Sequence, residues 1–331
     1  MEQINTDALK KKILDLAIRG KLVEQDPNDE PASVLLEKIR AEKEELIQQK
    51  KIKRNKNESY IFKGDDGLYY EKFQDGTVKS IQDEIPFEVP EGWVPARIEH
   101  IITEYFGGGT PKKNNPKFWN GEIPWASVKD LKGDNLYSTR DSITKEGLEN
   151  SSAKIAKAGD LIVASRINVG KISRNMIDTA INQDLKVIKI NINDTKEYFF
   201  YLIKTLNFTT KGTTVKGMTN EEFLNKLVVL PPLNEQINIV NKINNLLGVI
   251  EHIEDLYKSI KKLEIAIKSK SLNLAMQGKL IPQNPNDEPA SVLLEKVKEE
   301  KEKLIKEGKI KRNKKESTII RRGESYYELL D

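Results

Sequence analysis

Three loops in the middle of the chain combine lysine or arginine with small polar side chains and glycine. They run over residues 107–114, 165–171 and 211–217. Lysine and threonine suit contacts to phosphate oxygens, whereas arginine, asparagine and glutamine can also read the edges of bases. One such loop alone is more typical of a solvated turn, but three in one basic region favour binding to DNA. The candidate DNA-binding residues are Gly109, Thr110, Lys112, Lys113, Asn114, Ser165, Arg166, Asn168, Lys171, Lys211, Thr213, Thr214 and Lys216.

The net charge of the chain supports this interpretation once it is divided by region. The whole chain carries +4, from 55 Lys and Arg against 51 Asp and Glu. Residues 93–232 hold 20 basic and 15 acidic side chains, so the rest of the chain holds 35 and 36. The positive excess therefore lies in the region with the three loops, as expected for a domain that binds a polyanion.

Residue types that many enzymes need are scarce. The chain has no cysteine, which excludes disulfides, cysteine zinc sites, iron–sulfur clusters and a thiol nucleophile. Its two histidines, His100 and His252, have no serine or carboxylate at a recognisable spacing. The glycines at 107–109 are followed by Thr110-Pro111, which predicts a tight exposed loop instead of a cofactor loop that opens a helix. We therefore expect no catalytic site, no metal site and no bound cofactor.

Hydropathy and the first residues predict the location of the protein. No apolar run approaches the roughly 20 residues that a membrane span needs. The segment Met1–Asn5 does not resemble a signal peptide. We expect a soluble, cytoplasmic protein without membrane contact.

A long internal repeat organises the chain. Residues 20–59 and 278–317 align without a gap at an offset of 258, and 29 of the 40 positions are identical. The match extends backward more weakly, with Leu16-Ala17 against Leu274-Ala275. This similarity indicates a duplication, in which one central domain has a copy of the same arm on each side.

The pattern of elements predicts an α+β protein. Each arm is typical of a helix, a short turn and a second helix, and Asn28 or Asp29 is expected to cap the second helix of the first arm. Residues 60–82 predict short strands, and residues 93–232 a mixed α/β domain that is mostly antiparallel, with a helix over 197–206. The expected divisions are a helical arm at 1–59, a β-rich connector at 60–92, a DNA recognition domain at 93–232, a coiled-coil helix at 233–277, and a second helical arm with its tail at 278–331.

A long helix is predicted after the central domain. Between residues 235 and 277 apolar side chains recur every seven residues, with a second position four residues later and no proline. Such a helix would reach about 65 Å at about 1.5 Å per residue, and it needs a partner helix to bury its apolar seam. The predicted seam is Ile239, Ile243, Leu246, Ile250, Ile253, Tyr257, Ile260, Ile267 and Leu274.

Four segments occur in a specific order around the central domain. They are Pro86-Phe87-Glu88-Val89-Pro90-Glu91-Gly92-Trp93; Gly108-Gly109-Thr110-Pro111 with Asn115-Pro116, Trp119 and Gly121-Glu122-Ile123-Pro124-Trp125; Gly159-Asp160-Leu161-Ile162 with Ile181-Asn182-Gln183-Asp184; and Leu230-Pro231-Pro232-Leu233-Asn234-Glu235-Gln236 before the long helix. Together with the repeated arm, they resemble the specificity subunit of a Type I restriction–modification system. The resemblance covers nearly the whole chain.

This resemblance implies a non-catalytic subunit whose recognition domain reads double-stranded DNA. In the family, long helices form an antiparallel coiled coil and dock modification subunits, which bind S-adenosylmethionine and methylate adenine. A separate restriction subunit cuts DNA using ATP. A standard subunit has two recognition domains and this chain shows one, so the resemblance implies a half-subunit that self-associates and reads a split, inverted-repeat site.

Other functions remain open from the sequence alone. A coiled-coil scaffold without nucleic-acid binding would explain the heptads but not the basic loops. A methyltransferase is disfavoured by the missing cofactor and catalytic motifs. Pairing with a different half-subunit is the alternative to a homodimer, and it would give an asymmetric DNA site.

Overall fold

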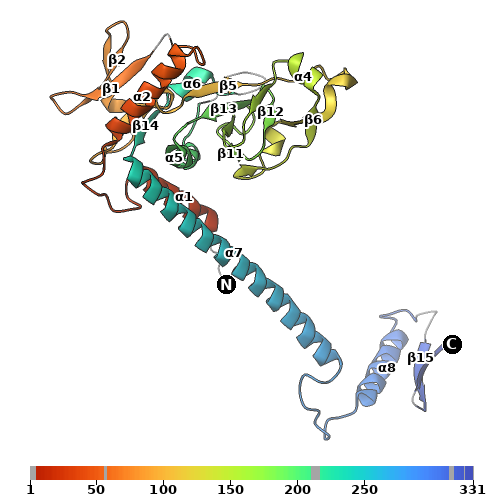
Figure 1. The fold of residues 1–331 in the computed structure, drawn as a ribbon. Coiled ribbons are helices and arrows are strands. Elements are labelled where there is room, and N and C mark those ends of the chain that lie inside the picture. The colour runs from red at the N-terminus through yellow and green to blue at the C-terminus, as the bar shows by residue number, and fades with distance from the viewer. Residues whose placement is uncertain (1–4, 56–57, 210–216, 313–316, 324, 331) are drawn as a thin grey trace. The chain divides into compact units, whose positions relative to one another are not determined.

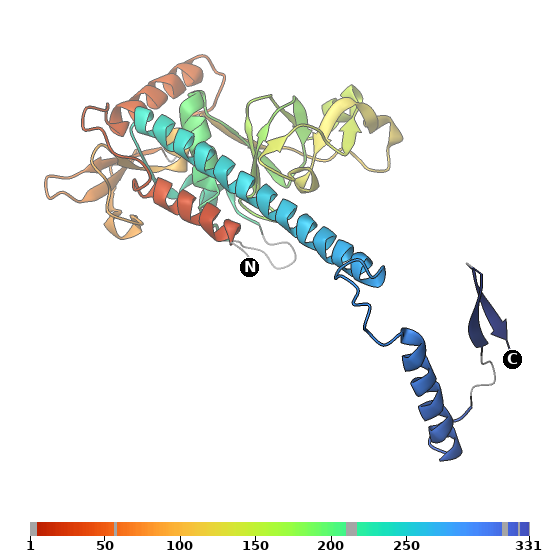
Figure 2. The same ribbon diagram turned by 90° about the horizontal axis from the view of Figure 1, so that it is seen from below.

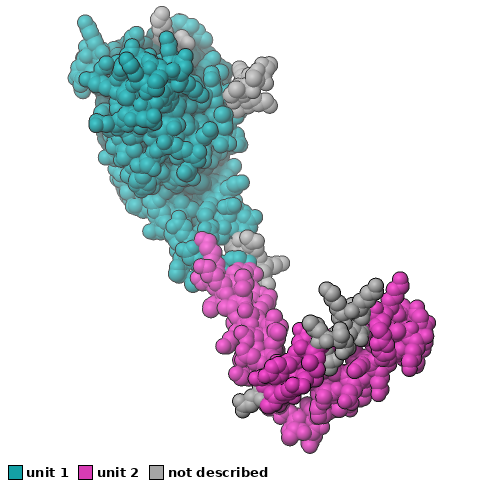
Figure 3. Space-filling view, turned by 90° about the vertical axis from the view of Figure 1, so that its right-hand side faces the viewer, with its two compact units in different colours: residues 1–257 teal, residues 258–331 magenta. Residues whose placement is uncertain are grey.

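The structure is a computed structural model that describes residues 5–55, 58–209, 217–312, 317–323 and 325–330. Residues 1–257 and 258–331 form two compact units (Figure 3). The finer domain boundaries expected from the sequence stay predictions. Within the described ranges, no helix has both the length and the hydropathy needed to cross a bilayer.

The first arm contains helices α1 (Thr6–Ile18) and α2 (Ala32–Gln48). The predicted capping of α2 by Asn28 or Asp29 is wrong, because the helix begins after Pro31 without a side-chain cap. The Asp29 carboxylate instead accepts a hydrogen bond from Asn234 Nδ2 at 2.9 Å. The turn between the two helices is therefore tied to the start of the long helix.

A small antiparallel sheet follows the first arm, as the sequence predicts. Its strands are β1 (Ser59–Lys63), β2 (Tyr69–Phe73) and β3 (Val78–Ser80), and the 3-10 helix η1 (Gln82–Glu84) follows. The two turns place Gly67 and Gly76 at φ +80° and +84°, a conformation that glycine adopts without strain. This sheet connects the arm to the central domain.

The central domain contains two main sheets and one strand pair. The five-stranded sheet has the order β5-β13-β10-β11-β7, with β5 (Glu104–Gly107), β7 (Asn135–Leu136), β10 (Leu161–Ala164), β11 (Ile172–Asn175) and β13 (Leu185–Lys189). The four-stranded sheet has the order β8-β6-β12-β9, with β6 (Trp119–Ala126), β8 (Asp141–Ile143), β9 (Lys154–Ala156) and β12 (Thr179–Ile181). Strand β4 (Val94–Arg97) pairs with β14 (Leu227–Leu230). Only β7 with β11 and β6 with β12 are parallel among these described pairs, so the expectation of a mostly antiparallel domain is confirmed.

Short helices connect and cover these sheets. They are α3 (Ile98–Ile101), η2 (Pro116–Phe118), η3 (Val128–Asp130), α4 (Lys145–Glu149), α5 (Asn193–Ile203) and α6 (Asn220–Leu224). Helix α5 begins four residues before the predicted start at 197. Thr219 caps α6 by accepting a hydrogen bond from Glu222 N at 3.0 Å.

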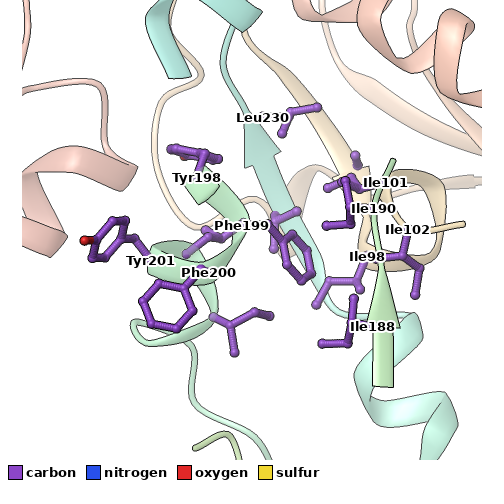
Figure 4. Packing of buried hydrophobic residues seen from close by; sticks show 14 of the residues in the cluster. Ile98, Ile101, Ile102, Ile188, Ile190, Tyr198, Phe199, Phe200, Tyr201 and Leu230 are labelled. Carbon is purple, nitrogen blue, oxygen red and sulfur yellow. The ribbon is translucent and has the colours of Figure 1, made fainter. Parts of the chain in front are cut away.

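The main core is built around α5. Phe199 is fully buried, and Figure 4 shows it directed toward Ile98 and Ile190, while Phe200 and Tyr201 lie on another side of the helix. The same cluster includes residues of α2 and of the long helix. The first arm, the central domain and the start of the long helix therefore share one core.

The predicted long helix is α7 (Leu233–Met276). Helix α1 lies beside its first half and runs antiparallel to it in both ribbon views (Figure 1, Figure 2). Seam residues Ile239, Ile243 and Ile250 are buried there, whereas Ile260 and Ile267 are 46% and 64% exposed. The remaining predicted seam residues are partly exposed: Leu246, Ile253, Tyr257 and Leu274. Helix α1 and the central domain thus cover the first part of the seam, whereas Ile260 and Ile267 farther along it are exposed in the part of the chain that the structure describes.

The second arm repeats the local structure of the first. Helix α8 (Ala290–Lys306) corresponds to α2 at the offset of 258. Strands β15 (Ser317–Arg322) and β16 (Ser325–Leu330) form an antiparallel hairpin. The duplication seen in the sequence is therefore also a duplication of secondary structure.

Candidate nucleic-acid interface

Three strand ends meet at one end of the five-stranded sheet. Strands β5 and β10 both pair antiparallel with β13, which lies between them. In this register Gly107 at the end of β5 is opposite Lys186, and Ala164 at the end of β10 is opposite Leu185. Two of the predicted DNA-binding loops therefore leave the sheet on either side of the turn that precedes β13.

The turn formed by residues 182–184, called the junction turn here, holds both loops. Thr110 Oγ1 of the first loop donates a hydrogen bond to Gln183 Oε1. In the second loop, the backbone N and the Oγ of Ser165 donate to Asp184 O at 2.8 and 3.1 Å. The Arg166 guanidinium lies 3.7 Å from the Asp184 carboxylate. The junction turn thus contacts the first loop through Gln183 and the second loop through Asp184, and the side chains of Gln183 and Arg166 are exposed.

The glycines of the first loop are required by packing. A Cβ added to Gly108 would lie 1.9 Å from Ile181 O, and Gly109 N donates to the same oxygen at 3.0 Å. A Cβ on Gly109 would lie 1.9 Å from Ser152 Oγ. The prediction of an exposed glycine loop is therefore wrong, because these glycines press against the end of β12, and Gly109 positions the loop instead of facing a ligand.

The residues after these glycines are exposed. The carbonyl of Lys112 accepts a hydrogen bond from Trp119 Nε1 at 3.2 Å, which holds the backbone of the loop. The side chains of Lys112, Lys113 and Asn114 remain accessible. A backbone held in place with accessible basic side chains suits contacts to phosphates.

A cationic cluster that the sequence did not indicate adjoins the junction turn. Burial and the nearby positive charges of Arg166 and Lys154 lower the pKa of Lys186 below its ordinary value. The ammonium group of Lys154 also lies 5.4 Å from the centre of the Phe106 ring. Cations that repel one another in this way favour a bound anion, which would offset the repulsion. Strand β9 carries Lys154 alone, and the two lysines of β13, Lys186 and Lys189, are not adjacent, so no local run of basic residues marks this cluster.

Other residues of the second loop lie in different settings. Ser165 is buried and therefore orients the loop, while Asn168 is exposed and has a φ of +58°. Lys171 lines a separate hollow of about 430 Å³ with Lys132 and Lys204. The structure therefore groups Arg166 with the junction turn and places Lys171 with other cations.

Most of the third predicted loop falls outside the described residues, including Lys211, Thr213, Thr214 and Lys216. Its last residue, Gly217, forms an isolated antiparallel bridge with Arg166. The next residue, Met218, donates its backbone N–H to Ser165 O at 2.8 Å. The end of the third loop is thus attached to the second.

His100 has polar neighbours that the sequence spacing did not reveal. Ser59 Oγ lies 3.3 Å from His100 Nε2 but donates its proton to Glu71 Oε1 at 2.6 Å. His100 Nδ1 accepts the backbone N–H of Arg97 at 3.2 Å. His100 therefore cannot act as a base toward Ser59, and the group joins β1, β2 and α3 instead of forming a catalytic triad. Among the described residues, no group of three or more histidine or carboxylate side chains could hold a metal ion.

Comparison with protein families gives a match over the central domain and part of α7. The family described as the Type I restriction modification DNA specificity domain matches residues 90–262. This range includes the junction turn, the cationic cluster and the first part of the heptad seam.

Curated relatives extend the similarity over most of the chain. The EcoEI specificity subunit of Escherichia coli is 29% identical over 358 residues, which cover 92% of this chain and 57% of that subunit. The EcoAI specificity subunit of the same organism is 29% identical over 390 residues, with the same two coverages. This chain thus spans a little over half the length of these two relatives.

A solved structure shares the fold. A chain from work on the "structural basis underlying complex assembly and conformational transition of the type I R-M system" aligns with a TM-score of 0.50 and 16% identity. The alignment covers 83% of this chain and 58% of that chain. The expected α+β fold, with a mixed central domain and a long helix, agrees with this neighbour.

Proposed function

Because the chain belongs to the Type I restriction–modification DNA specificity family, we propose that it reads DNA sequence and directs partner modification subunits to a bipartite site. The junction turn is the observation that carries this proposal. It brings Thr110, Gln183 and Arg166 together beside Lys154 and Lys186, so base-reading and phosphate-binding side chains share one edge. The alternative of a coiled-coil scaffold without nucleic-acid binding is not favoured, because it explains neither this edge nor the family match.

Loss of a cation beside the junction turn should change the salt dependence of DNA binding. We expect Arg166→Ala and Lys186→Ala each to reduce the slope of log affinity against log salt by about one unit, because each removes one phosphate contact. If Arg166 reads a base instead, its loss should cost about 1–3 kcal/mol with the slope unchanged. Fluorescence anisotropy with a duplex that contains the methylated site, over a series of salt concentrations, measures both quantities.

Lys157→Ala is the matched control for these variants. Lys157 is an exposed lysine of the same domain, and it pairs with Asp178 at 2.7 Å instead of contacting the junction turn. Its removal should leave affinity and slope almost unchanged. Unchanged values for Arg166→Ala and Lys186→Ala as well would exclude the junction turn from the interface.

We further propose that this chain supplies specificity and no chemistry of its own. Other residues of the chain occupy the space beside the glycines at 107–109, so this loop leaves no room for a cofactor. S-adenosylmethionine and ATP are therefore assigned to the modification and restriction subunits. Self-association of the chain through α7 would supply two identical recognition domains, which fit an inverted repeat in DNA.

Methyl transfer should require both this chain and its modification subunit. The isolated chain is expected to transfer no methyl group from radiolabelled S-adenosylmethionine to DNA. Co-expression of the two proteins, followed by methylome sequencing, should reveal one methylated word made of two inverted half-sites. Methyl transfer by the chain alone would contradict the non-catalytic role, and an asymmetric word from these two proteins would contradict the homodimer.

A further inference from the structure

The two arms fold alike but differ in what covers them. Helices α2 and α8 begin and end at corresponding positions of the repeat. Leu35 on α2 is 3% exposed because it packs in the core of the first unit, whereas its counterpart Leu293 on α8 is 60% exposed. Two further buried positions of α2 have exposed counterparts on α8: Ala32 with Ala290, and Ile39 with Val297. The face that docks the first arm is thus present on the second arm, where the described residues of its own unit leave it exposed.

The second arm also keeps the polar residues that attach the first arm. Ala32 N donates to Gly92 O at 2.9 Å, and Lys43 Nζ donates to Glu99 O at 2.7 Å. Asp29 accepts from Asn234 Nδ2. The residues that correspond to these three arm residues are identical: Ala290, Lys301 and Asp287.

Most of the positions that differ between the two arms lie outside the docking face. Eleven of the 40 aligned positions differ, and ten of these are described in the first arm. Eight of the ten are exposed there. The other two exchange one aliphatic side chain for another, Val23 for Ile281 and Ile39 for Val297, which a packed surface tolerates. The second arm therefore fits the surface that the first arm covers.

The correspondence continues into α7. The offset of 258 places α1, residues 6–18, on residues 264–276, the last part of α7. Lys10 on α1 is matched by Lys268, and Ala17 by Ala275. Since α1 lies antiparallel to the first half of α7, the last part of α7 is expected to lie antiparallel to the first half of another α7.

One ion pair fixes the register of this contact. Lys10 Nζ lies 2.8 Å from Glu254 Oε1 within the first unit. In the repeat-related contact, Lys268 of one copy would face Glu254 of the other. Residue 261 is midway between these positions, so a two-fold axis beside Lys261 forms the same ion pair twice. The exposed apolar residues nearest this axis, Ile260 and Leu263, would then be buried between the helices.

We propose that residues 264–312 are an exchangeable docking segment, which on a second copy of this chain takes the surface that residues 6–54 cover in the first unit. The inference rests on the self-association proposed above and adds its contact surface and register. One surface cannot hold both segments, so docking between copies displaces residues 6–54. The chain then has a closed state, with its own first arm docked, and an exchanged dimer.

Engineered cysteines test this exchange directly, because the chain has no cysteine of its own. Two differently tagged forms, Asn234→Cys and Asp287→Cys, are co-expressed and treated with a short bis-maleimide. Asn234 contacts Asp29 within the first unit, so Asp287 of a second copy should reach it after exchange. We expect a covalent dimer that carries both tags on a denaturing gel, and absence of this dimer would overturn the proposal.

Matched substitutions in the two arms provide the control. Ala290→Glu adds a charge to an exposed position, so the first unit still folds, but the linkage should fall by at least about tenfold because that charge would have to be buried on docking. Ala32→Glu at the corresponding buried position should instead raise the linkage several-fold, because it weakens the competing first arm. Equal linkage with Ala290→Glu, with Ala32→Glu and with neither substitution would refute the exchange. Light scattering shows which proposal fails when no linkage forms. A dimer without linkage refutes only the exchange, whereas a monomer refutes the self-association as well.

Discussion

Gly108→Ala should destabilise the central domain by about 3 kcal/mol and abolish site-specific DNA binding. The added Cβ would lie 1.9 Å from Ile181 O and 2.6 Å from Ile181 Cγ1. A backbone oxygen at the end of a buried strand cannot move away as a flexible side chain could, so β5 and β12 must separate. Because the junction turn follows β12 directly, Gln183 and Asp184 would be displaced with it. Urea unfolding measures the loss of stability, and anisotropy measures the loss of binding.

Gly133→Ala is the matched control in the same domain. A Cβ at Gly133 would meet nothing within 4 Å, and its φ lies outside the left-handed region. The free energy of unfolding should change by less than about 0.5 kcal/mol. Unfolding of Gly108→Ala at the same urea concentration as the unmodified chain would contradict the close packing of the glycine loop against β12.

Repetition and periodicity made much of the fold predictable. The heptads over residues 239–274 predicted α7, and the pattern of residues 60–82 predicted the short strands of the connector sheet. These signals are local, because each depends on residues a few positions apart. The repeat added a signal that is not local, since two segments 258 residues apart share one structure.

The candidate interface was predictable only in part, for a physical reason. The loops at 109–114 and 165–171 are marked by composition, but the contact between them passes through Gln183 and Asp184, far away in the sequence. Lys154 and Lys186 lie on strands of different sheets, β9 and β13, so only the tertiary structure brings them near Arg166. The close approach of Gly108 to Ile181 likewise depends on two sheets that no local pattern relates.

Burial of His100 should make the folded protein lose stability in acid. Burial, followed by the positive charges of Lys43 and Arg97, lowers the pKa of His100 from 6.5 to about 4, although Glu71 opposes this. Between these values the unfolded chain binds a proton that the folded chain does not, so stability falls as the pH drops through this window. The shift corresponds to a loss of about 3 kcal/mol between about pH 7 and pH 4. Urea unfolding at a series of pH values measures it.

His100→Asn should remove this part of the pH dependence, because asparagine does not titrate and its Oδ1 can accept the Arg97 N–H in place of Nδ1. The groups that face or perturb His100 come from α2, β1, β2 and β4: Arg40, Lys43, Ser59, Glu71 and Arg97. The carboxylates of the chain titrate in both proteins, so the difference between the two pH curves isolates His100. His252, the only other histidine, is exposed on α7, and His252→Asn should retain the full pH dependence. Parallel curves for the unmodified chain and His100→Asn would show that His100 is not held neutral by its burial.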